Sequence, residues 1–351
     1  MKGIGMSVIV YGHVAHSTTV PLTPPIYLKQ LGVVFFLFAT GFTLARERRQ
    51  AAEVLFNRLF QIYLFGVSLA VLMATKGLLT GSGLGLSNFL PFLGGANVAF
   101  DNFPANPTTW YLGTYLHFLI LWAVVLRRVR VQMWMVALAI AVEIAVRALL
   151  MARAGGYIAY MLMTNWSAVF LLGMVRGGED EAEPQGSAIP YAVALVTGFV
   201  VWGTAMRRVG FDFTFPFMSL QWWPGPVGVA MVSAAVSILY VGAAALTFEA
   251  TRRLAAPAAV QFIARNSLII FLAHMPVFFA LHPVLVSWGL GYWPQVAVQM
   301  LVCLAALAVA SEWIHALVQP ERLRVRVFAT LVARRHPGAR PGMPFSFCRK
   351  V

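Results

Sequence analysis

Long apolar runs recur from the first residues of the chain to about position 315, and only short polar joints separate them. The 351-residue chain is 60% hydrophobic and 11% charged, and its mean hydropathy is +0.77. Soluble globular domains carry about 25% charged residues, so this composition excludes a soluble fold. We therefore expect an all-α integral membrane protein, since helices satisfy their own backbone hydrogen bonds in lipid.

A bilayer core about 30 Å thick needs roughly 20 apolar residues for each helix that crosses it. About ten runs meet this requirement, at residues 3–20, 28–45, 54–75, 110–126, 133–152, 157–175, 189–206, 226–248, 266–285 and 294–315. We expect them to form one transmembrane domain over residues 1–315, followed by a basic cytoplasmic tail over residues 316–351.

Basic residues gather at alternate joints between these runs. The positive-inside rule then predicts that both termini are cytoplasmic and that the number of spans is even. The inside joints carry Arg46, Arg48, Arg49, Arg127, Arg128, Arg130, Arg176, Arg252, Arg253 and Arg265, and further basic residues follow in the tail. Topology thus explains the net charge of +14 better than nucleic-acid binding does. The two cysteines, Cys303 and Cys348, suggest neither a disulfide framework nor a metal site.

Placing an ionisable side chain at membrane depth costs free energy, so each such residue is a functional candidate. The candidates are His13, Arg58, His117, Glu143, Arg147 and His274. Glu143 and Arg147 lie four residues apart, with the acid first, which predicts a structural ion pair within one helix. The roles of His117 and His274 stay open on these grounds alone.

Lys2 and His13 are eleven residues apart, so a continuous helix places them on one face with a rise of roughly 16 Å. Two interpretations are open. Lys2 is either a snorkelling anchor or a contact for a phosphate at the inner surface. His13 is either a hydrogen-bonded structural histidine or a proton acceptor near the middle of the bilayer.

Five segments occur in this order: Lys2 to His13, Thr40-Gly41-Phe42, FNRLFQIY (56–63), TWYLGTYLHFLILW (109–122) and RNSLIIFLAHMPV (265–277). Together they resemble the acyltransferase-3 family of bacterial membrane-bound acyltransferases. Lys2, ten residues and His13 resemble the signature of the family's first helix, and Thr40-Gly41-Phe42 resembles the end of the second-helix pattern. The segment FNRLFQIY (56–63) resembles the Arg-x-x-Arg motif, with Arg58 in the first place. The Trp-x-Leu helix is matched by TWYLGTYLHFLILW (109–122), and the late motif with Ser267 and His274 by RNSLIIFLAHMPV (265–277).

This resemblance implies a ten-helix membrane enzyme that transfers an acyl group, commonly acetyl, from cytoplasmic acyl-CoA to a hydroxyl. The acceptor would be extracytoplasmic or membrane-associated, often a glycan, and the enzyme would lie in the bacterial inner membrane among its lipids. His13 would be the catalytic base or acyl relay, and no metal is expected. The donor would be held by Lys2, Arg48, Arg49 and Arg58. Candidate cavity residues are Thr40, Trp110, His117, Ser267 and His274.

Two departures from the family pattern affect these expectations. Gln61 stands where a second arginine is common, so phosphate binding there is either weaker or handled by Arg48 or Arg49. Tyr115 and Leu116 replace two glutamates of some members, which argues against the subgroup that modifies lipopolysaccharide O-antigen. A multi-pass transporter is the alternative from another class, although no inverted repeat is evident. An inactive acyltransferase-like membrane protein is the other alternative.

Overall fold

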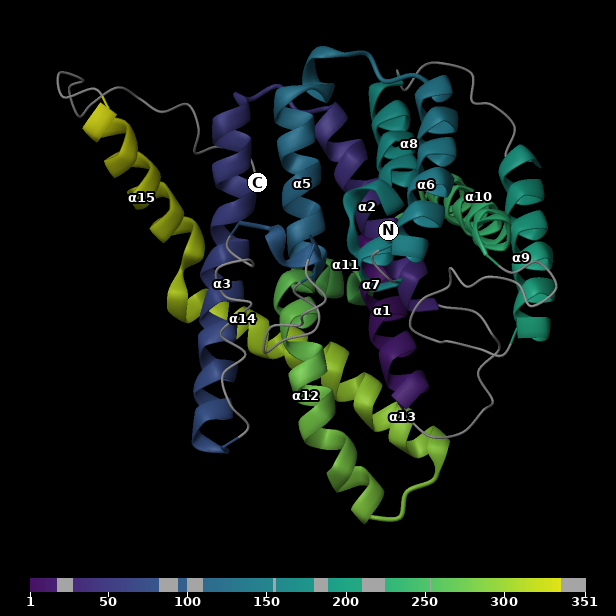
Figure 1. The fold of residues 1–351 in the computed structure, drawn as a ribbon. Coiled ribbons are helices and arrows are strands. Elements are labelled where there is room, and N and C mark those ends of the chain that lie inside the picture. The colour runs from purple at the N-terminus through teal and green to yellow at the C-terminus, as the bar shows by residue number, and fades with distance from the viewer. Residues whose placement is uncertain are drawn as a thin grey trace. The chain divides into compact units, whose positions relative to one another are not determined.

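The computed structural model describes residues 1–17, 28–81, 94–99, 110–153, 156–179, 189–209, 225–252 and 254–335. Every regular element in these ranges is a helix (Figure 1). The chain divides into two compact units, Met1–Ser311 and Glu312–Val351. The first unit contains all of the predicted site residues.

The first unit is built from helices throughout the described ranges. In chain order they are α1 (Lys2–Ser17), α2 (Leu28–Ala45), α3 (Ala51–Leu79), η2 (Ala96–Ala99), α5 (Trp110–Val124), η4 (Leu126–Arg128), α6 (Met133–Arg153), α7 (Gly156–Met161), η5 (Met163–Asn165), α8 (Ser167–Gly178), α9 (Ile189–Val209), α10 (Pro226–Thr251), α11 (Ala258–Arg265), α12 (Ser267–Ser287), α13 (Tyr292–Met300), the π-helical segment η6 (Leu301–Ala306) and α14 (Leu307–Val318), whose last residues belong to the second unit. The second unit also contains α15 (Pro320–Arg335).

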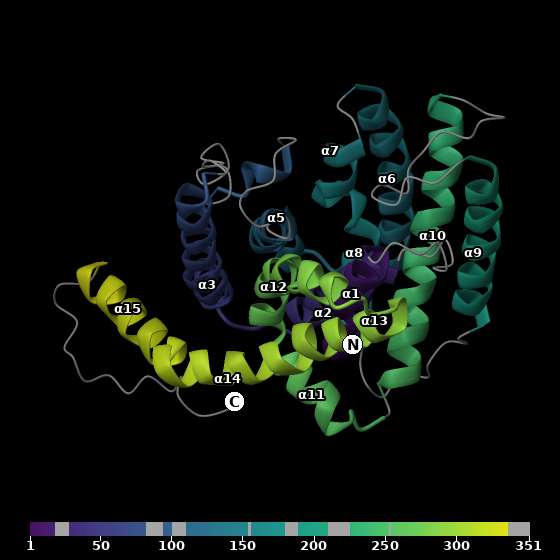
Figure 2. The same cartoon turned by 90° about the horizontal axis from the view of Figure 1, so that it is seen from below.

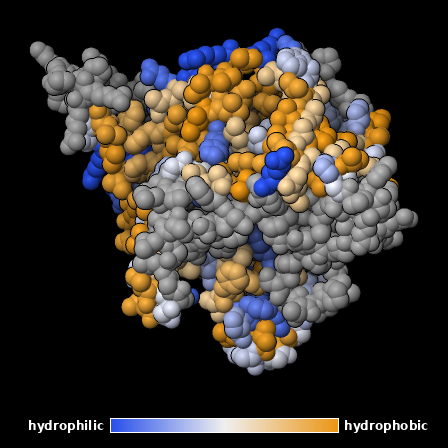
Figure 3. Space-filling model, in the orientation of Figure 1, coloured by the Kyte–Doolittle hydropathy of each residue, from blue (hydrophilic) through white to orange (hydrophobic). Residues whose placement is uncertain are grey.

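Within the described ranges, six helical stretches are long and apolar enough to cross a bilayer. They are Ala51–Leu79, Trp110–Arg128, Met133–Arg153, Pro226–Thr251, Ser267–Ser287 and Tyr292–Val318. The prediction of an all-helical chain with several membrane spans is confirmed at this level, and hydrophobic residues cover much of the face shown in Figure 3. The other predicted spans fall on α1, α2, α7 with α8, and α9. Ten spans and two cytoplasmic termini stay predictions.

The predicted continuous helix over residues 157–175 is wrong, because the chain leaves the α-helix between α7 and α8. The turn exposes backbone groups that side chains then satisfy. Asn165 Nδ2 donates to the carbonyl of Tyr160 at 2.9 Å, and Trp166 Nε1 donates to the same carbonyl at 3.0 Å. Arg147 Nη2 donates to the carbonyl of Asn165 at 2.7 Å. The break is therefore held by polar side chains that hydropathy alone does not assign.

The predicted ion pair between Glu143 and Arg147 is confirmed, with a distance of 3.0 Å between Oε2 and Nη2. Both side chains are buried, with 2% and 1% exposed. Glu143 Oε1 accepts from the backbone N–H of Ala168 at 2.8 Å, and its Oε2 accepts from Ser237 Oγ at 2.6 Å. Arg147 Nη1 donates to the carbonyl of Ser233 at 3.0 Å. The pair thus joins α6 to the start of α8 and to α10, with hydrogen bonds to both charged groups.

Helix α8 in turn packs closely on α2, because glycines occupy the contact from both sides. A Cβ at Gly41 would collide with the carbonyl of Phe170, and a Cβ at Gly173 would collide with the carbonyl of Phe38. Small residues at helix contacts let membrane helices approach to backbone distance. Figures 1 and 2 show α1 beside α2, with α12 and α13 close to α1. The buried network therefore supports, through α8, the helices that carry the site.

Replacing Arg147 by alanine should leave the Glu143 carboxylate buried without its cationic partner. Removal of one partner from a buried pair costs about 3–5 kcal/mol. We expect Arg147→Ala to lower the thermal denaturation midpoint of the purified protein in detergent by many degrees. The matched control is Arg153→Ala, which removes an exposed arginine from the end of the same helix. Equal midpoints for the two variants would contradict a stabilising role for the network.

Candidate functional site

Two histidines from distant parts of the chain meet in the first unit. His13 Nδ1 on α1 lies 2.9 Å from His274 Nε2 on α12, and the rings stack with their centroids 5.0 Å apart. His274 is 1% exposed, whereas His13 is half-buried. The sequence places both histidines at membrane depth but does not indicate that they touch.

The backbone around His274 decides which nitrogen of each ring carries a proton. His274 Nδ1 lies 2.8 Å from the carbonyl oxygen of Phe271 and 3.1 Å from that of Ile270. Because a carbonyl oxygen only accepts, Nδ1 of His274 must carry the hydrogen. The Nε2 of a neutral His274 then accepts, so His13 donates from its own Nδ1. The lone pair of neutral His13 is therefore on Nε2, which is the atom able to take up a proton.

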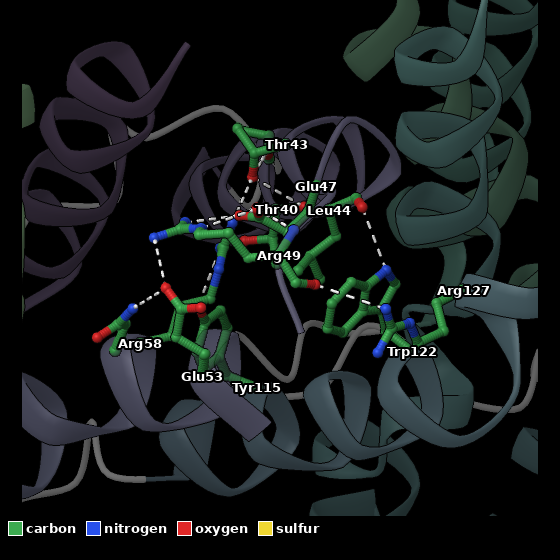
Figure 4. Close-up of polar contacts among 12 residues, drawn as sticks. Thr40, Thr43, Leu44, Glu47, Arg49, Glu53, Arg58, Tyr115, Trp122 and Arg127 are labelled. Atoms are coloured by element: carbon green, nitrogen blue, oxygen red, sulfur yellow. Dashed lines mark hydrogen bonds and ion pairs between the residues drawn. The ribbon is translucent and has the colours of Figure 1, made fainter. Parts of the chain in front are cut away.

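Arg58 lies where α2, α3 and α5 meet (Figure 4). Its Nη1 donates to Tyr115 Oη at 3.3 Å, and its Nη2 donates to Thr43 Oγ1 at 3.1 Å. The Thr43 hydroxyl donates to the carbonyls of Ala39 and Thr40, both at 3.0 Å, so its lone pairs are left to accept from the guanidinium. These contacts orient the arginine without neutralising its charge.

Lys2 lies close enough to Arg58 for their positive charges to repel one another. The Lys2 side chain is exposed and that of Arg58 is half-buried. Two cations held side by side favour an anion between them. Binding of a phosphate group by these two residues stays a prediction from the sequence.

A line of aromatic rings connects Arg58 to the histidine pair. Tyr115, which accepts from Arg58, has its ring 6.1 Å from that of Tyr111. The Tyr111 ring lies 5.2 Å from that of Phe271, and Phe271 lies 6.1 Å from His274. This wall brings the predicted cationic and catalytic residues into one continuous region. Tyr111 and Phe271 were not among the predicted site residues, although each lies within four residues of one that was.

Arg49 and Arg48, also predicted to bind the donor, lie in the joint between α2 and α3. Arg49 donates two hydrogen bonds to the Glu47 carboxylate, from Nε at 2.9 Å and from Nη2 at 2.7 Å. These hydrogen bonds lower the pKa of Glu47 to about 2, and the Glu47 carboxylate raises the pKa of Arg49. The exposed Arg48 lines a cavity of about 830 Å³ between the ends of several helices. The Glu47 carboxylate that Arg49 binds also interacts electrostatically with Arg58. The role of Arg48 and Arg49 with the donor stays a prediction.

Two of the remaining predicted cavity residues, Thr40 and Trp110, contact Tyr111 of the aromatic wall. Trp110 is buried against Trp166, with 6.0 Å between ring centroids. His117 is half-buried beside Gly95, and Ser267 begins α12 seven residues before His274. Thr40 is buried, and its hydroxyl donates to the carbonyl of Phe36 at 2.8 Å. Only Thr40, through its neighbour Thr43, borders the Arg58 contacts directly.

Metal binding has no visible site in the part of the chain that the structure describes. No cluster of three or more His, Cys, Asp or Glu side chains is present there. The thiol of Cys303 is buried and donates weakly to the carbonyl of His274, with 3.7 Å between sulfur and oxygen. In the described ranges the histidine pair is therefore the arrangement best suited to proton transfer.

Comparison with known proteins identifies the family of the chain. No curated protein and no solved structure shows significant similarity to the chain. Residues 1–314 match the acyltransferase-3 family, which is described as an acyltransferase domain. The match spans most of the 351 residues. The chain therefore belongs to the acyltransferase-3 family, which indicates a membrane acyltransferase.

Proposed function

We propose that this protein is an O-acyltransferase of the bacterial inner membrane. It moves an acyl group, most commonly acetyl, from cytoplasmic acyl-CoA to a hydroxyl of an extracytoplasmic or membrane-associated acceptor, foremost a glycan. The observation that carries the proposal is the contact between His13 and His274, which supports His13 as the proton acceptor on the helix face that begins at Lys2. Family membership supports acyl transfer, and the geometry supports where it takes place.

In the direct mechanism, His13 Nε2 accepts the proton of the acceptor hydroxyl while the hydroxyl oxygen attacks the thioester carbonyl. The new C–O bond forms, the C–S bond breaks, and the proton passes from His13 to the departing CoA thiolate. The positive charge that His13 carries meanwhile is shared through its Nδ1–H with His274. His274 in turn is oriented by the carbonyls of Phe271 and Ile270.

In the relay mechanism, His13 Nε2 itself attacks the thioester carbonyl, the C–S bond breaks and CoA leaves as its thiolate. The acceptor oxygen then attacks the acyl-histidine, the C–N bond breaks, and the hydroxyl proton is lost to solvent, from which the thiolate takes one up. The same tautomer serves this route, because Nε2 again needs its lone pair. A covalent acyl-enzyme gives ping-pong kinetics, whereas the direct mechanism requires both substrates to be bound together. Initial-rate kinetics with varied donor and acceptor therefore separate the two routes.

The donor site follows from the cations and the aromatic wall. Lys2 and Arg58 hold phosphates of the polyanionic cofactor, and the wall of Tyr115, Tyr111 and Phe271 guides its less polar arm toward His13. The helical rise from Lys2 to His13 is roughly 16 Å, a separation that the long arm of the cofactor is suited to cover. The nucleotide end thus stays at the cytoplasmic surface while the thioester enters the membrane.

Replacing His13 by alanine should reduce acyl transfer by about 10²–10⁴-fold, because that is the usual contribution of a positioned general base. Release of CoA from acetyl-CoA by equal amounts of purified protein measures this effect. His315→Ala is the control, since His315 lies in the second unit. Unchanged transfer by a normally expressed His13→Ala variant would remove His13 from the reaction.

His274 is expected to act as a positioning residue. His274→Ala should lower kcat with little effect on the KM for acyl-CoA, because the ring of His13 loses the acceptor that fixes its tautomer. His274→Gln should recover part of the lost kcat, since a glutamine oxygen can accept from His13 Nδ1. Identical kcat values for the two variants would contradict this hydrogen-bonding role.

Arg58→Ala should raise the KM for acyl-CoA by about 10–100-fold, the usual cost of one hydrogen bond to a charged group. The effect on kcat should be smaller, because Arg58 lies at the far end of the aromatic wall from His13. Arg128→Ala, which removes another cation from an exposed helix end, should leave KM unchanged. An unaltered donor dependence in Arg58→Ala would place the donor phosphates elsewhere.

A further inference from the structure

We propose that the cavity of about 830 Å³ binds the phosphate headgroup of an anionic phospholipid, separately from acyl transfer. It lies between the last turns of α2 and α8, the end of α5 with η4, and the beginning of α6. Three arginines line it: Arg48, Arg127 and Arg130. Basic pockets between membrane helices on the cytoplasmic side are typical sites for anionic lipid headgroups.

The charge of this cavity is positive because its carboxylates are already paired with cations that do not line it. Glu47 is bound by Arg49 at 2.7 Å, and Glu179 is bound by Arg176 at 2.8 Å. In the described ranges, no ion pair links a carboxylate to any of the three lining arginines. Their guanidinium groups therefore keep a net attraction for an anion, and their planar geometry suits phosphate oxygens.

Arg127 is held in place at the edge of the cavity. Its guanidinium lies 5.6 Å from the centre of the Trp122 ring, and its Nη2 donates to the carbonyl of Arg49 at 3.5 Å. Trp122 is 1% exposed and donates from Nε1 to the carbonyl of Leu44 at 3.2 Å. This side chain therefore loses less conformational freedom on binding than a mobile surface arginine would.

Apolar surface next to the cavity indicates a lipid rather than a soluble phosphate compound. Val129 and Met133 line the cavity and are 46% and 45% exposed. From Met133 the exposed apolar surface continues along α6 through Trp134 and Leu138. Figure 3 shows hydrophilic residues at the end where α5 leads to α6, with hydrophobic surface beside them. A phospholipid satisfies both parts, with its phosphate among the arginines and its acyl chains along α6.

The cavity is distinct from the contacts around Arg58. Thr43 contacts Arg58, whereas the next residue, Leu44, lines the cavity and accepts from Trp122. Figure 4 shows the two sets of contacts joined through Arg49, whose side chain binds Glu47 and whose carbonyl accepts from Arg127. The hydrogen-bond partners of Arg58, Thr43 and Tyr115, do not line the cavity, so the two sites are adjacent but use different side chains.

Native mass spectrometry of the purified full chain tests the proposal, with phosphatidylglycerol and phosphatidylcholine as the added lipids. Wild-type protein should bind phosphatidylglycerol more tightly than phosphatidylcholine. The triple variant R48A/R127A/R130A should bind phosphatidylglycerol roughly a hundred-fold more weakly, and phosphatidylcholine unchanged. The matched control R128A/R322A/R326A removes the same charge outside the cavity and should bind both lipids like wild type.

Equal binding of the two lipids by wild-type protein would overturn the proposal, as would tight binding of phosphatidylglycerol by the triple variant. A third arm with adenosine 3′,5′-bisphosphate tests the nucleotide end of the donor. If the triple variant loses this nucleotide but keeps phosphatidylglycerol, the cavity is a nucleotide site and the proposal fails. If the triple variant does not fold, Arg130→Ala should still weaken phosphatidylglycerol binding about five-fold. No acyl transfer is measured, so failure of the proposed function leaves this result unaffected.

Discussion

The fold depends on the satisfaction of polar groups that lie away from water. Glu143 and Arg147 carry full charges in a buried position, where an unpaired charge is very costly. Their charges are compensated by hydrogen bonds to α8, to α10 and to the turn at Asn165. These segments must therefore pack around the ion pair. Because α8 in turn fits closely against α2 through glycines, the network also supports the helix beside the site.

The histidine pair follows the same requirement with a different outcome. His274 is buried and has both ring nitrogens in hydrogen bonds, two to backbone carbonyls and one to His13. That arrangement assigns the tautomer of His13 and directs the lone pair to Nε2. A structural hydrogen bond of His13 is therefore compatible with its proposed catalytic function, because the hydrogen bond fixes the tautomer that the function requires. The sequence pattern of Lys2 and His13 had left the two interpretations open.

Much of the fold could be predicted from the sequence because membrane helices are selected by length and hydropathy, and most of the predicted runs fall on helices in the described ranges. The break between α7 and α8 could not, since it depends on Arg147, which lies on another helix. Helical spacing predicted the face shared by Lys2 and His13. It could not predict the contact with His274, because that contact depends on how α1 and α12 pack, 261 residues apart in sequence. Arg49 was predicted from charge alone, and its binding to Glu47 is local geometry that charge does not specify.

The central claim is that the thioester of the donor reaches His13 from the cationic position at Lys2 and Arg58. A structure determined with a non-hydrolysable acyl-CoA analogue tests this directly. We expect the analogue's phosphates beside Lys2 and Arg58, and its acyl carbonyl about 3–3.5 Å from His13 Nε2, the separation of reacting atoms in a near-attack geometry. An analogue bound with its acyl carbonyl away from both histidines would contradict the account.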